Sequence, residues 1–194
     1  MKKWRLDFRV WHWVHAAVVL GLLGTVFLRK TFLSWRTNSE LLSQKLTEMD
    51  LAVTTEQAKT LATTIRAPMW EWHILLGYAL AGLLLWRILL FFTESGKHNY
   101  RNFKEETLYK KIVKLGYIVL YGVLAFMALS GLTLHFNEAL GLTKEATHTL
   151  KEVHELVYNA VLVFVPLHII GVVIAESREE KGIISEMVHG GERS

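Results

Sequence analysis

The sequence predicts an all-α protein: an integral membrane four-helix bundle with a helical extramembrane loop between the first two membrane helices. Of the 194 residues, 52% are hydrophobic, more than is usual in a soluble domain. Cysteine is absent, which excludes disulfides, thiolate-bound iron–sulfur clusters and covalent c-type haem attachment. Four apolar runs are each long enough for a helix to cross the hydrocarbon core of a bilayer: residues 10–28, 72–92, 115–136 and 156–175.

The apolar runs, extended into their interfacial flanks, define a single membrane domain, 1–194. The first run follows a basic start, MKKWR, as in a signal peptide. It is too long for the apolar region of a signal peptide, and no small-residue cleavage site follows it. We therefore expect a retained helix. The predicted membrane helices are at about 10–32, 70–92, 112–136 and 152–176.

The segment between the first two spans, about 33–69, is too long for a simple turn, and we expect it to contain helices. Thr37 and Thr54 are followed three residues later by Glu40 and Gln57, which is the spacing of a capping box at the start of a helix. Two interpretations stay open for this segment. It is either a passive connector with surface helices or a docking site for a partner.

The charge distribution suits a membrane surface. The net charge of +4 comes mostly from Lys and Arg in the flanks of the apolar runs, where anionic lipid headgroups lie, and no nucleic-acid-binding motif occurs. An even number of crossings places both termini on one side. The basic residues on that side predict that it is cytoplasmic: Lys2, Lys3, Arg5, Arg9, Lys97, Arg101, Lys104, Lys110, Lys111, Arg178, Lys181 and Arg193.

Histidines at matching membrane depths form the candidate site. The chain has nine histidines. With the N-terminus inside, His12 lies near the cytoplasmic surface and His73 near the outer one. His154 and His168 are fourteen residues apart on the last span, so they share a helix face about 21 Å apart, with His154 at the outer level. A buried imidazole in a membrane is costly unless a partner satisfies it.

These depths predict two bis-histidine pairs, His12 with His168 and His73 with His154. Each pair can hold a haem iron between facing helices, and ligation would offset the cost of the buried rings. The sequence therefore predicts two b-type haems per chain. His15, 60° around the helix from His12, is the alternative ligand at the inner level.

Residues near the predicted ligands suit a flat, anionic cofactor. Gly77 lies one turn after a predicted ligand on the same helix face, where a missing side chain leaves room for a macrocycle. Arg9 and Lys151 each precede a predicted ligand by three residues, so each cation can reach haem propionates at its own membrane surface. His135 and His148, at the outer level, are candidates for proton or quinone chemistry.

Four patches of the sequence resemble one family. They are the R-x-x-H-W of Arg9, His12 and Trp13, the H-x-x-x-G-Y of the second span, the two histidines of the last span, and the tail GIISEMVHGG. Together they resemble the bacterial cytochrome b561 and Ni/Fe-hydrogenase b-type cytochrome family. The resemblance implies a four-helix core with two b-type haems, electron transfer across the bacterial inner membrane, and quinone or quinol as a redox partner. It implies ligands at His12, His73, His154 and His168.

The expected function is therefore electron transfer between membrane quinone or quinol and a redox partner at the membrane surface. Such a chain is either a free-standing oxidoreductase, serving for example a periplasmic redox protein, or the membrane anchor subunit of a larger dehydrogenase such as a hydrogenase. The long loop at 33–68 departs from the family pattern and leaves the periplasmic partner open. A histidine-rich metal transporter without haem is the further alternative. It is disfavoured because the membrane core lacks Asp and Glu and no internal repeat is seen.

Overall fold

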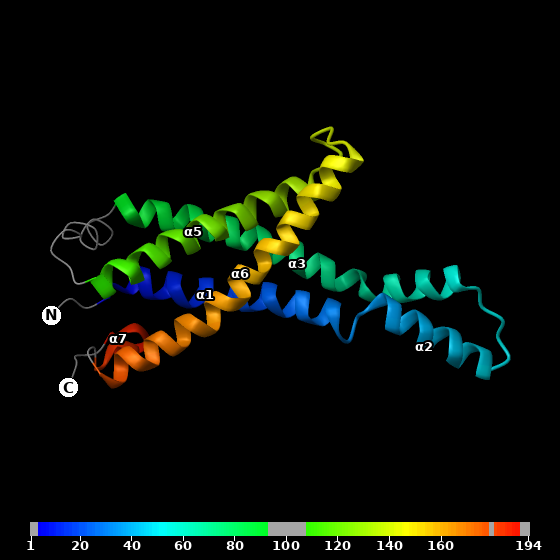
Figure 1. Cartoon of the computed structure of the whole chain (residues 1–194), viewed down its shortest axis with the longest axis horizontal. Helices are drawn as coiled ribbons and strands as arrows, with labels where there is room; N and C mark the ends of the chain where they lie inside the picture. The colour runs from blue at the N-terminus through cyan, green and yellow to red at the C-terminus, as the bar shows by residue number, and fades with distance from the viewer. Residues whose placement is uncertain (1–3, 93–107, 179–180, 191–194) are drawn as a thin grey trace. The chain divides into compact units, whose positions relative to one another are not determined.

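The computed structural model describes residues 4–92, 108–178 and 181–190, and its regular elements in these ranges are all helices (Figure 1). Four of them, α1, α3, α5 and α6, are long and apolar enough to cross a membrane, as the sequence predicts. The elements in chain order are α1 (Leu6–Lys30), α2 (Trp35–Glu48), α3 (Thr55–Phe92), α5 (Leu108–His135), α6 (Lys144–Ser177) and α7 (Ile183–His189).

The chain divides into two compact units, which are described separately. Unit 1 is Met1–Ala16 with Tyr78–Ser194, and unit 2 is Ala17–Gly77. In unit 1, α5 packs against α6, and α6 packs against α7. Large apolar side chains such as Leu156 lie exposed on the spans, as expected where lipid rather than protein covers them. The buried apolar side chains of unit 1 are Trp11, Leu80, Leu83, Leu90, Leu124, Ala128 and Val161.

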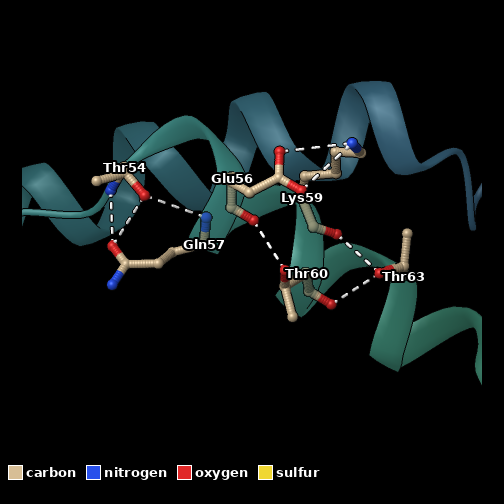
Figure 2. Close-up of polar contacts among 6 residues, drawn as sticks. All are labelled: Thr54, Glu56, Gln57, Lys59, Thr60 and Thr63. Carbon is tan, nitrogen blue, oxygen red and sulfur yellow. Dashed lines mark hydrogen bonds and ion pairs between the residues drawn. The ribbon is translucent and has the colours of Figure 1, made fainter.

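Unit 2 contains a helical hairpin made by α2 and the first part of α3, which lie side by side in Figure 1. Ala58 and Ala62 are 1% and 0% exposed, and small side chains of this kind allow two helices to approach closely. The predicted capping box at the start of α3 is confirmed (Figure 2). The backbone N–H of Thr54 donates to Gln57 Oε1 at 2.9 Å, and the backbone N–H of Gln57 donates to Thr54 Oγ1 at 3.2 Å.

The second predicted capping box is wrong. The residue before α2 is Ser34, and Thr37 lies inside the helix, where its hydroxyl donates to Ser34 Oγ at 3.3 Å. The helix therefore starts one turn earlier than the spacing of Thr37 and Glu40 suggested. A capping-box pattern within a helix is uninformative about its start, since Ser and Thr side chains also bond locally at interior positions.

Helix α3 begins at Thr55, directly after the predicted cap Thr54, and continues through Pro68 to Phe92, so the predicted loop helix and the second membrane helix are one continuous helix. The residues before Pro68 are polar, so the apolar run does not include them, but they belong to the same helix. Hydropathy shows where a helix contacts lipid and does not show where its backbone hydrogen bonding begins. One connected helix links the hairpin to His73.

The C-terminal tail forms a short helix, α7, which the sequence did not predict. Gly182 and Gly190 flank it with left-handed φ values of 86° and 67°, a conformation that glycine adopts readily. The side chain of Glu176 accepts from the backbone N–H groups of Gly182 and Ile184, so α6 holds the start of α7. Several basic residues used to predict orientation lie outside the described residues: Lys2, Lys3, Lys97, Arg101, Lys104 and Arg193.

Candidate functional site

The inner pair of predicted ligands is brought together within unit 1. His12 on α1 and His168 on α6 have ring centroids 6.2 Å apart, with an angle of 60° between the ring planes. An imidazole nitrogen binds a metal such as zinc at about 2.0–2.1 Å, and the ring centre lies behind it, so two rings on opposite sides of one ion have centroids about 6 Å apart. The separation of His12 and His168 therefore matches that of two axial ligands of one iron.

The surroundings of His168 hold its ring. Tyr117 Oη lies 3.2 Å from His168 Nδ1, and the ring of Phe164, one turn earlier on α6, stacks on the imidazole at 6.0 Å with a 10° interplanar angle. With Nδ1 facing the phenol, metal ligation by His168 would use Nε2. Ligand histidines commonly have a hydrogen-bond partner at the nitrogen that does not bind the metal.

His154, also in unit 1, lies against two consecutive small residues of α5. Ser130 Oγ is 2.7 Å from His154 Nδ1. A Cβ added at Gly131 would lie 3.4 Å from His154 Cε1, so the glycine lets α5 approach the imidazole closely. Both neighbours are residue types that allow α5 and α6 to pack around a ring.

His73 belongs to unit 2, where Thr25 on α1 contacts it. Thr25 Oγ1 lies 2.7 Å from His73 Nδ1, and the indole of Trp70 meets the imidazole edge-on at 5.5 Å. One turn after His73, a Cβ added at Gly77 would meet no atom within 4 Å. This open space is consistent with the predicted room for a macrocycle. Because His73 and His154 belong to different units, their pairing stays a prediction.

The alternative ligand, His15, has different neighbours from His12. Its ring stacks on Trp11 with centroids 4.8 Å apart and an 18° interplanar angle, and Trp11 itself donates from Nε1 to Leu83 O at 2.8 Å. Within the described residues, His15 Nε2 is buried without a hydrogen-bond partner. His12, rather than His15, lies opposite His168, which favours His12 as the inner ligand.

The two cations predicted to meet propionates differ in their contacts. Arg9 donates from Nε to Met187 O at 3.2 Å and from Nη2 to Val188 O, so it binds the C-terminal end of α7. Trp13 Nε1 also donates to Met187 O, at 3.1 Å. Lys151 is exposed on α6. A guanidinium has five N–H donors, so these contacts leave the predicted propionate role of Arg9 untested.

Sequence reasoning assigned no role to Arg87, the one charge in the apolar run of the second span. Its guanidinium carbon lies 5.4 Å, 5.6 Å and 5.5 Å from the ring centroids of Phe8, Trp11 and Tyr121, and its Nε donates to Tyr121 Oη at 3.2 Å. Aromatic faces attract a cation that is shielded from water. The signal was visible in the sequence, because a charge inside a membrane span needs a partner.

The donor set fits a haem better than a bare metal ion. In the described part of the chain, no group of three or more His, Cys, Asp or Glu side chains could hold a metal ion. Two facing imidazoles suit an iron whose remaining four ligands come from a macrocycle. His12 and His168 are therefore the pair of residues in unit 1 that would hold a haem iron.

The family comparison identifies the kind of protein. The sequence model of the family described as prokaryotic cytochrome b561 matches residues 3–190. The chain belongs to this family. It is therefore a membrane b-type cytochrome, a protein that holds b-type haem and transfers electrons. Neither a curated protein nor a solved structure was found to match the chain.

Proposed function

We propose that this cytochrome holds two b-type haems and moves electrons between quinone or quinol in the bilayer and a redox partner at the membrane surface. The 6.2 Å separation of the His12 and His168 rings carries the proposal, since it suits axial ligation of one iron. The second haem is assigned to His73 and His154. Each of these rings has a hydroxyl at Nδ1, as is common for ligand histidines.

The two proposed ligand pairs lie at different depths because α6 contributes one histidine to each. Fourteen residues separate His154 from His168, which is about 21 Å along the helix. Bound haem supplies one-electron chemistry between ferric and ferrous iron. His12 and His168 would hold one haem and His73 and His154 the other, and the two sites would act as successive steps across the membrane.

The proposed orientation places both termini in the cytoplasm of a bacterium and the α2–α3 hairpin on the opposite side of the inner membrane. The excess of basic residues on the terminal side supports it. In this orientation His12 and His168 form the cytoplasmic site, and Arg9 and Lys151 lie at opposite surfaces, where they can meet propionates. Quinone enters from the lipid beside one of the two sites.

The test is the haem content of purified protein and of single-histidine variants, measured as the pyridine haemochrome. We expect two haems b per chain in the wild type. His12→Ala and His168→Ala should lose one and the same haem, and His73→Ala and His154→Ala the other, as judged from the reduced α-band. His148→Ala is the matched control, because this exposed histidine lies 3.7 Å from the carboxylate of Glu152 and should keep both haems. One haem or none in the wild type would refute the di-haem proposal.

Two versions of this function differ in assembly. A free-standing oxidoreductase turns over quinol when purified alone, whereas an anchor subunit co-purifies with a dehydrogenase such as a hydrogenase. Gentle extraction from the native membrane, followed by size analysis of the haem-containing species, separates the two. The metal-transporter alternative is disfavoured by the family assignment.

A further inference from the structure

Two buried hydroxyls contact proposed haem ligands in the same way. Thr25 Oγ1 donates to Leu22 O at 2.7 Å and lies 2.7 Å from His73 Nδ1. Ser130 Oγ donates to Phe126 O at 2.6 Å and lies 2.7 Å from His154 Nδ1. The first contact joins α1 to α3, and the second joins α5 to α6. The arrangement therefore occurs independently on two pairs of helices.

Counting protons fixes the direction of each hydrogen bond to the imidazole. A hydroxyl has one proton, and in both cases it is directed to a backbone carbonyl, which can only accept. The hydroxyl oxygen therefore presents a lone pair to the ring, and the short contact requires a proton on Nδ1. A neutral imidazole protonated at Nδ1 has its free lone pair on Nε2, which is the form that binds a metal through Nε2.

Burial makes the two hydroxyls hard to replace. Thr25 is 7% exposed and Ser130 is 4% exposed, so water has little access to either contact. Without the hydroxyl, the Nδ1–H group would lose its acceptor in an apolar environment. A ring that loses this contact is also free to rotate about its side-chain bonds. Each hydroxyl can therefore set both the tautomer and the orientation of its histidine.

We propose that Thr25 and Ser130 are positioning residues for the two axial ligands of one haem, the outer one. This inference rests on the proposed function, in which His73 and His154 share an iron. Each hydroxyl oxygen accepts a hydrogen bond from Nδ1–H, which makes the imidazole more basic and would favour the ferric state, so both hydroxyls would lower the potential of that haem. At the inner pair, the contact of His168 is with a phenol at 3.2 Å, and the same proton count does not apply.

The experiment measures redox titrations of the α-band and the haem content of Thr25→Val and Ser130→Ala in the full-length protein. Both variants should raise the midpoint potential of the same haem and leave the midpoint potential of the other haem unchanged. We expect a shift of up to about tenfold in the reduction equilibrium, or about 59 mV for one electron. Loss of affinity for that haem by about 10- to 100-fold is the accompanying effect.

Conservative and control variants separate positioning from packing. Thr25→Ser and Ser130→Thr keep the hydroxyl and should titrate like the wild type. Thr31 and Thr133 also donate to the carbonyl four residues earlier, at 2.7 Å and 2.9 Å, and neither hydroxyl bonds a histidine in the described residues. Thr31→Val and Thr133→Val should therefore leave both potentials unchanged.

The outcomes distinguish this proposal from the proposed function. A wild-type protein without haem b would overturn both. A wild-type protein with two haems, combined with Thr25→Val and Ser130→Ala variants that titrate like the control variants, would overturn only the positioning role. If the two variants moved different transitions, the assignment of both hydroxyls to one haem would be overturned. If haem is lost in the Val and Ala variants but kept in the Ser and Thr variants, the positioning role is supported.

Discussion

Gly190, which ends α7, provides a quantitative test of how the tail is held. Its φ of 67° is left-handed, and a Cβ at this position would collide with the guanidinium of Arg9. In Gly190→Ala, the left-handed backbone costs about 1–2 kcal/mol, and the displaced Arg9 loses hydrogen bonds worth about 0.5–1.5 kcal/mol. The docked state of α7 should therefore lose about 1.5–3.5 kcal/mol, which is about 10- to 300-fold in its opening equilibrium.

Hydrogen exchange of the α7 amides in the full-length protein measures this loss, because exchange reports local opening. Gly141→Ala is the matched control. Gly141 also has a left-handed φ, 64°, but a Cβ there would meet nothing within 4 Å. It should lose only the backbone cost in its own turn, about 1–2 kcal/mol. Equal effects of the two substitutions would show that the Arg9 contact contributes nothing, and unchanged exchange in α7 would refute its docking.

Three further predictions concern the site and the hairpin. His15→Ala should keep both haems, because His12 faces His168; loss of a haem in the pyridine haemochrome would instead make His15 the ligand. Redox titration of the wild type should resolve two steps. A quinol analogue should reduce only one of the two single-haem variants, His73→Ala and His168→Ala, as fast as it reduces the wild type. If both were reduced that fast, a relay between the haems would be excluded. Thr54→Ala should cost the hairpin about 1 kcal/mol through its lost cap, seen as faster amide exchange in the first turn of α3, whereas no change there would discount the capping box.

The membrane helices could be predicted because lipid imposes a length and a composition on them. The continuity of α3 through Pro68 could not, since no hydropathy signal shows whether a polar helix and an apolar helix are joined. The two capping-box patterns show the same limit. Thr54 and Gln57 form the box, whereas Thr37 lies inside α2, because the pattern alone does not say which turn is the first.

At the candidate site, the sequence predicted that His12 and His168 would meet, because helix direction and membrane depth restrict which residues can be neighbours. It did not identify Thr25 or Ser130. A hydroxyl in a membrane helix bonds its own backbone whether or not a second helix uses its lone pair, so the role depends on rotation of the helix about its axis. The contact of Arg9 with α7 was missed for a different reason, because it joins residues far apart in the sequence.

Helix α6 carries one histidine of each proposed ligand pair and so sets the distance between the two pairs. Because α6 is one helix from Lys144 to Ser177, with Pro166 inside it, the number of residues between His154 and His168 sets the spacing of the two imidazoles. Insertion of a single residue between them would turn one imidazole by about 100° relative to the other. An insertion or deletion between these two positions would therefore change the relative placement of the two proposed iron sites, whereas a substitution that keeps the helix would not.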